Sequence, residues 1–173
     1  LFLHSPVIGA QTEKNRICAL NCVDDEGMFE IRAKAFVDAS GDANLARLAG
    51  AKVMWGDAQG RVQAASLPFR LSGVDITKDM SPAAVKCAVE QARNAGMEHL
   101  PRESGFLLTL EGSQVVCALI PSVMPEGLSA RELTRMEQEL REQAVSYAAA
   151  LKRYMPGMEH SELVMIGPSI GLR

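Results

Sequence analysis

The residues best suited to hold a ligand stand together in one short run, DASGD, at positions 38–42. Ser40 supplies a hydroxyl, Asp38 and Asp42 supply carboxylates, and Gly41 leaves the backbone between them uncovered. A turn of small residues that leads into a helix brings backbone N–H groups close to a ligand, and such groups favour anions and hydroxyls. The residue types at 38–42 are thus compatible with contact to a small molecule, although a connection of this kind more often serves packing alone.

The segments on either side must place this run at a bend. Before it, residues 35–37 are apolar and β-prone, which predicts a buried strand. After it, Asp42 is a good helix N-cap, and the segment 43–49 carries its leucines on one side, which predicts a short helix ending before Gly50. Asp38 is equally suited to capping the strand end. A connection of this kind can also serve packing alone, so a purely structural interpretation stays open.

The order of residue types around the bend resembles a known motif. Residues 37–42, Val-Asp-Ala-Ser-Gly-Asp, followed by the short helix and by Ala-Gly-Ala at 49–51, resemble the second flavin-contacting motif of FAD-dependent oxidoreductases. The usual form of that motif is an apolar strand followed by Ala-Thr-Gly-Asp, and Ser40 in place of threonine keeps the hydroxyl. The resemblance implies that the turn passes the FAD and that Asp42 reaches its ribityl or diphosphate portion. On this basis we expect Ser40, Gly41 and Asp42 to contact the cofactor, with Asp38 as a further candidate.

Three strands are expected before the motif, at residues 1–9, 16–23 and 28–33, and the third can run on into 35–39. The polar turn DDEG at 24–27 predicts a hairpin between the second and third strands. A β-meander before the Ala-Thr-Gly-Asp strand is also the order of parts in the flavoprotein family. The resemblance therefore implies that residues 1–53 are a partial FAD-binding domain, and we place a boundary at the loop that carries Trp55.

Residues 62–173 predict an α+β arrangement in which two helices cover an antiparallel sheet. A Ser-Pro pair at 81–82 begins the first helix, which ends at Gly96. A serine and a glutamate three apart, at 129 and 132, form a capping box that begins the second helix, which ends near Tyr154. Strands are predicted at 62–71, 106–110, 114–120 and 162–166. Pro68 inside the first of these implies an edge position or a bulge, because proline donates no N–H.

The second region also resembles the flavoprotein family, as the substrate-side or cap domain over the flavin. The strand at 63–71, the segment Pro-Gly-Met at 156–158 and the last seven residues, 167–173, look like landmarks of that domain. Arg70 and Arg173 are candidates to face an anionic substrate or the flavin, although a solvated surface position is the ordinary role of an arginine. No pattern in the sequence designates a general acid or base.

Composition limits the classes of partner. The 173 residues carry a formal net charge of −3 with scattered lysines and arginines, which argues against nucleic acid, and no apolar run is long enough to span a membrane. Cys18 and Cys22 lie four residues apart in one predicted strand, about 13 Å, too far for a disulfide. We expect free thiols in a reducing compartment, the cytoplasm. The histidines have no metal-site spacing, so no metal is expected.

No Gly-x-Gly-x-x-Gly turn occurs in the sequence, so the unit that holds the FAD diphosphate in this family is not among these residues. We therefore expect an internal piece of a longer flavoprotein, with the remainder of that protein and a small-molecule substrate as its partners, and only weak or absent FAD binding by the piece alone. The alternative is a non-catalytic α+β ligand-binding or interaction module whose Asp-capped turn is structural.

Overall fold

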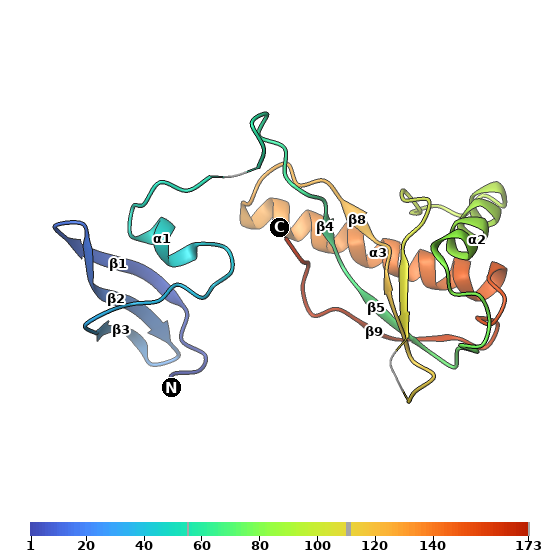
Figure 1. Ribbon diagram of the computed structural model, residues 1–173, viewed down its shortest axis with the longest axis horizontal. Coiled ribbons are helices and arrows are strands. Elements are labelled where there is room, and N and C mark those ends of the chain that lie inside the picture. Colours follow the sequence, from blue (N-terminus) through green and yellow to red (C-terminus); the bar gives the residue numbers. More distant parts are fainter. Residues whose placement is uncertain (55, 110–111, 173) are drawn as a thin grey trace. The chain divides into compact units, whose positions relative to one another are not determined.

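The computed structural model describes residues 1–54, 56–109 and 112–172 (Figure 1). The chain divides into two compact units, Leu1–Gly60 (unit 1) and Arg61–Arg173 (unit 2). Both units contain antiparallel strands and α-helix, so the predicted α+β class is confirmed. Trp55, which the sequence places at the boundary between domains, lies outside the described residues.

Unit 1 is a three-stranded antiparallel meander followed by a short helix (Figure 1). Its elements are β1 Val7–Glu13, β2 Arg16–Asp24, β3 Gly27–Arg32 and α1 Asn44–Leu48. The predicted hairpin forms between β2 and β3, where Asp24 Oδ1 accepts hydrogen bonds from the backbone N–H groups of Glu26 and Gly27 at 2.9 and 3.1 Å. Gly27 has a φ of 135°, a conformation that side chains disfavour, so glycine suits this turn.

The described part of unit 1 buries little apolar surface. Its only buried hydrophobic residues are Ala19 and Cys22, both on β2. Helix α1 has no buried residue. Large apolar side chains instead stand in solvent, among them Phe2 at 68% exposure, Met28 at 79% and Val37 at 88%. A folded domain normally closes a contiguous core, so unit 1 presents apolar surface that its own residues leave uncovered.

Two of the predicted strand boundaries in unit 1 are wrong. The first strand begins at Val7, not at residue 1, because Pro6 cannot donate to the ladder. The predicted continuation of strand through 35–39 does not form, and these residues belong to neither a helix nor a strand. The side chains of Asp38 and Ser40 accept hydrogen bonds from nearby backbone N–H groups, and this local bonding competes with strand pairing.

Unit 2 contains two antiparallel sheets and two helices. Its elements are β4 Ala65–Ser66, β5 Phe69–Ser72, α2 Pro82–Asn94, β6 Phe106–Thr109, β7 Val116–Leu119, β8 Ser122–Val123, α3 Ala130–Tyr154 and β9 Glu162–Ile166. The larger sheet has the order β6-β7-β5-β9, and β4 pairs with β8. The predicted hairpin of β6 and β7 and the final strand are both confirmed.

The strand predicted at 62–71 is divided in two at Leu67 and Pro68, between β4 and β5. Proline interrupts the ladder, and the chain resumes pairing at Phe69. Of the two predicted alternatives, an edge position or a bulge, the edge position does not occur, because β5 lies between β7 and β9 inside the larger sheet. The irregular step in this part of the sheet is in the pairing with β9, where the register shifts between Arg70 and Leu71.

The two helices begin where their start signals predict. Ser81 Oγ accepts the N–H of Ala84 at 3.3 Å at the start of α2. Ser129 Oγ accepts the N–H of Glu132 at 3.2 Å at the start of α3. The other half of the expected capping box is absent among the described contacts, because the Glu132 carboxylate accepts the N–H of Glu126 at 3.3 Å and pairs with an arginine.

Both helices pack on one face of the larger sheet and close the main core. Tyr147 of α3 is fully buried there. Its hydroxyl donates to the Arg102 carbonyl at 2.8 Å and accepts the Arg102 N–H at 2.7 Å, which ties the loop before β6 to the helix. Burial raises the pKa of the Tyr147 hydroxyl, so it stays protonated as this pair of hydrogen bonds requires.

Candidate functional site

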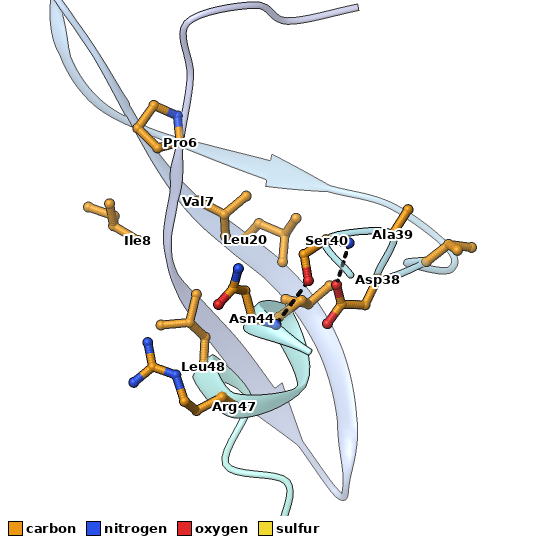
Figure 2. A pocket seen from close by; sticks show the side chains of 12 residues that line it. Pro6, Val7, Ile8, Leu20, Asp38, Ala39, Ser40, Asn44, Arg47 and Leu48 are labelled. Atoms are coloured by element: carbon orange, nitrogen blue, oxygen red, sulfur yellow. Dashed lines mark hydrogen bonds between the residues drawn. The ribbon is translucent and has the colours of Figure 1, made fainter. Parts of the chain in front are cut away.

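The loop before α1 is held by two of the predicted site residues. Asp38 Oδ1 accepts the N–H of Ser40, and Asp38 Oδ2 accepts the N–H of Ala46, both at 3.0 Å. Ser40 Oγ accepts the N–H of Asn44 at 3.0 Å and that of Asp42 at 3.4 Å. Figure 2 shows the Asp38 and Ser40 side chains turned towards this backbone. Asp38 and Ser40 therefore satisfy the helix donors that sequence reasoning left free for a ligand.

Asp42 does not cap the helix, so that prediction is wrong. The N-cap position belongs to Ala43, which has a φ of 53° and makes no side-chain cap. Its left-handed backbone places Asp42 one residue too early to reach the first-turn N–H groups. Ser40 and Asp38 cap the helix instead, since they accept the N–H groups of Asn44 and Ala46. The predicted alternative, Asp38 at the end of a strand, is wrong, because residues 35–39 form no strand.

Gly41 and Asp42 form the open edge of the loop. Gly41 has a φ of 79°, and a Cβ built on it would meet nothing within 4 Å, so a ligand can approach its backbone. Within the described residues, the side chain of Asp42 has no hydrogen-bond or ion-pair partner, and neither has the Gly41 N–H. This edge offers one free donor and one free carboxylate to solvent.

Asp38 and Ser40 also line a pocket of about 660 Å³ within unit 1. Its other walls are the start of β1, Leu20 of β2 and one side of α1 (Figure 2). Most of that lining is apolar, and Gly41 and Asp42 are not part of it. The predicted site residues therefore divide between two surfaces: Gly41 and Asp42 on the open edge, Asp38 and Ser40 at the rim of the apolar pocket.

Sequence reasoning missed two polar residues of this pocket, Asn44 and Arg47. Arg47 is the one cationic side chain in its lining and has no hydrogen bond or ion pair in the described part of the chain. The signal was available, because positions three apart share a helix face and Arg47 follows Asn44 at that spacing. The neighbouring leucines of the helix indicated an apolar face, and for that reason the polar pair was overlooked.

The carboxylate of Asp38 is held in its ionised form. Hydrogen bonds from the Ser40 hydroxyl and from the backbone N–H groups of Ala46 and Ser40 keep its pKa below the ordinary value. Because its pKa is lower in the folded state, ionised Asp38 stabilises the fold at pH values above its unfolded pKa of about 3.9. This stabilisation is lost as the pH falls through the pKa of Asp38 in the folded state.

As the pH is lowered, the start of α1 is therefore expected to loosen at a higher pH than the meander does. Amide hydrogen exchange at Asn44 and Ala46 should accelerate as the pH falls below about 4, relative to the intrinsic rate. The variant Asp38→Asn should show fast exchange at these amides already at neutral pH, and Asp42→Asn, the matched control, should not. Equal exchange in the two variants would contradict the capping role of Asp38.

In unit 2, Arg70 lies on β5 with its side chain exposed, and Cys117 of β7 is its ladder partner. Arg173, the other predicted substrate contact, lies outside the described residues. Among the described residues no cluster of three histidine, cysteine or carboxylate side chains is arranged to hold a metal ion. No described helix is both long and apolar enough to cross a membrane.

A family model described as FAD dependent oxidoreductase matches residues 1–173. The chain belongs to the FAD dependent oxidoreductase family. The match covers both units, including the Asp38–Asp42 loop and the sheet that carries Arg70. The predicted membership of this family is thus confirmed, and contact of residues 37–42 with the flavin stays a prediction. A comparison of the sequence with curated proteins gives no match.

Solved structures share the fold of this family member. One is a geranylgeranyl bacteriochlorophyll reductase-like protein from Thermoplasma acidophilum, with a TM-score of 0.52 and 16% identity over 96% of this chain. Another is BexE, from a study of oxidation during BE-7585A biosynthesis, with a TM-score of 0.52 and 16% identity over 97% of this chain. The chain spans 36% and 28% of the lengths of these two structures.

The family implies FAD, and the loop can be tested for its fit to that group. The helix donors already bind Asp38 and Ser40, and the open edge carries a free carboxylate, Asp42, which would repel a diphosphate. A free carboxylate beside a free N–H suits hydroxyl groups, which donate to the one and accept from the other. The Gly41–Asp42 edge therefore fits the ribityl portion of FAD better than its diphosphate.

Proposed function

We propose that this chain is part of an FAD-dependent oxidoreductase, in which residues 1–53 form one wall of the FAD site and residues 62–173 form the substrate-side domain. The observation that carries the proposal is the family match over all 173 residues. The division of the chain after Gly60 supports the assignment of separate roles to the two regions. The enzyme's substrate is a small molecule.

FAD, when bound, supplies hydride or electron transfer at its isoalloxazine ring. The residues of this chain supply binding and orientation. Asp42 accepts hydrogen bonds from cofactor hydroxyls, and the uncovered backbone at Gly41 allows close approach. Ser40 and Asp38 support cofactor binding indirectly. Their side chains accept hydrogen bonds from the backbone and so fix the conformation of the loop. In unit 2, Arg70 and Arg173 are the proposed contacts to substrate.

The uncovered apolar surface of unit 1 supports a partner role for the remainder of the flavoprotein. The wall of the pocket beside α1 includes Val7 and Ile8, exposed to 39% and 46%. Burial of such side chains contributes about 25 cal/mol per Å² of apolar surface. We assign this wall to another segment of the FAD-binding domain and the Gly41–Asp42 edge to the cofactor. The four free cysteines support the reducing cytoplasm as its location.

The chain purified alone is expected to carry no stoichiometric FAD. Its described residues offer the open edge for hydroxyl contacts, and no Gly-x-Gly-x-x-Gly turn is present in the sequence to hold the diphosphate. The measurement is the flavin absorbance of the purified 173-residue chain, and then of the chain joined to the remainder of the flavoprotein. Tight FAD in the joined protein and not in the chain is the expected result.

One observation favours the alternative, a non-catalytic α+β module. Asp38 and Ser40 already satisfy backbone N–H groups at the start of α1, so the loop needs no ligand to bind them. The two functions differ in what the joined protein does. No flavin in the joined protein, with the fold intact by circular dichroism, would favour the non-catalytic module. Stoichiometric flavin that is reduced by an artificial electron donor would exclude it.

A further inference from the structure

The larger sheet of unit 2 has a second face, opposite to α2 and α3. Successive side chains of a strand point to opposite faces. Phe69 and Leu71 of β5 are buried in the core with the two helices. Arg70, between them, therefore points away from the helices, to what we call the outer face.

The ladder places apolar side chains around Arg70 on this outer face. Cys117 of β7 is opposite Arg70 on one side and Met165 of β9 is opposite on the other. Leu108 of β6 is the next partner beyond Cys117, and Phe106 lies two residues before it on the same face. Phe106, Leu108 and Met165 are exposed to 57%, 50% and 44%. Exposed apolar side chains therefore lie on both sides of Arg70, and exposed apolar side chains gathered on one face favour a binding surface.

The guanidinium of Arg70 has no hydrogen bond or ion pair within the described residues. Two other arginines of unit 2 are paired, Arg135 with Glu132 and Arg141 with Glu137. A guanidinium that is covered without an anionic partner is costly, because it loses its water and gains nothing in return. Whatever covers the outer face must therefore bring an anionic group to Arg70.

We propose that the outer face binds the substrate of this enzyme and that the substrate is an apolar molecule carrying one carboxylate. The apolar body would cover Leu108, Phe106 and Met165, and the carboxylate would pair with the planar guanidinium of Arg70 in bidentate fashion. The inference rests on the proposed function in one respect, the assignment of unit 2 to the substrate side. It goes further in naming the chemistry of the substrate and the surface that binds it.

Two other occupants fit less well. A neutral apolar ligand would strip water from Arg70 and leave its charge unpaired. A second copy of the chain, packed isologously with its axis at the centre of this face, would bring Arg70 against the same residue of the copy, and like charges repel. An amphipathic anion is the occupant that satisfies the charge and covers the apolar surface together.

The experiment titrates the 173-residue chain, without flavin, with decanoate and naphthoate and with their neutral counterparts decanol and naphthol, by calorimetry. We expect one or both carboxylates to bind and each neutral alcohol to bind roughly ten-fold or more weakly. Arg70→Gln should lose that difference, and Arg70→Lys should keep part of it. Arg131→Gln is the matched control, since Arg131 is exposed on α3 and unpaired in the described structure.

Cysteine alkylation locates the bound probe. Cys117 is half-buried on the outer face and Cys87 is exposed on α2, on the helical side. The bound carboxylate should slow alkylation of Cys117 and leave Cys87 unchanged, as read by mass spectrometry. No binding by either carboxylate, equal binding by acid and alcohol, equal affinity of Arg70→Gln and the wild type, or no protection of Cys117 would each overturn the proposal. These readouts need no flavin, so they fail independently of the FAD assignment.

Discussion

Replacing Asp42 by alanine is expected to weaken FAD binding by roughly ten- to a hundred-fold in the flavoprotein proposed for this chain. Asp42 is the free carboxylate at the open edge of the loop, and hydrogen bonds to a charged group contribute about 1.5–3 kcal/mol each. Since Asp42 makes no side-chain contact within the described residues, its loss should leave the stability of unit 1 nearly unchanged. Cofactor affinity and fold stability are thereby separated.

The measurement is the dissociation constant of FAD, obtained by fluorescence titration of apoprotein. Asp25→Ala is the matched control, because Asp25 is an exposed aspartate in the turn between β2 and β3. Asp42→Asn should retain part of the affinity, since its amide oxygen still accepts a hydrogen bond. If Asp42→Ala binds FAD as tightly as Asp25→Ala does, the cofactor does not contact this edge.

Truncating Tyr147 to alanine is expected to destabilise unit 2 by about 3–5 kcal/mol. The ring is fully buried between α3 and the sheet, and its hydroxyl makes both hydrogen bonds to the Arg102 backbone. Tyr147→Phe keeps the ring and loses both hydrogen bonds, so it should cost about 1–3 kcal/mol. The loss expected for Tyr147→Ala is large relative to the stability of an ordinary domain, which is about 5–15 kcal/mol.

Urea denaturation followed by the helical circular dichroism signal reports on unit 2, because α2 and α3 contain most of the described helix. The other tyrosine, Tyr154, is half-buried at the end of α3 and supplies the matched control, Tyr154→Ala. Tyr147→Ala should cost more than either Tyr154→Ala or Tyr147→Phe. A Tyr147→Ala variant no less stable than the control would show that the core does not depend on this ring.

Local signals in the sequence predicted the helices of unit 2 well. The caps at Ser81 and Ser129 act within three residues, and both hydrogen bonds are present. The strand order could not be predicted in the same way, since pairing of β5 with β9 joins residues far apart in sequence. The interior position of β5, and with it the setting of Arg70 among apolar side chains, depends on that pairing.

In unit 1 the loop before α1 shows the limit of the same reasoning. An aspartate next to a helical segment predicts an N-cap, and Asp42 met that description. The left-handed backbone at Ala43 shifted the helix start, and Asp38, eight residues before Ala46, reached the donor instead. A hydrogen bond that spans a loop of this length depends on the path of the loop, which residue types alone do not determine.

If the Ser40–Asp42 turn lies against FAD, binding of the cofactor should protect its backbone amides. The measurement is amide hydrogen exchange in the joined flavoprotein, compared with and without FAD. We expect FAD to slow exchange at Gly41 and Asp42 and to leave the turn at Asp24–Gly27 unchanged. Tight flavin binding with unchanged exchange at Gly41 and Asp42 would contradict it.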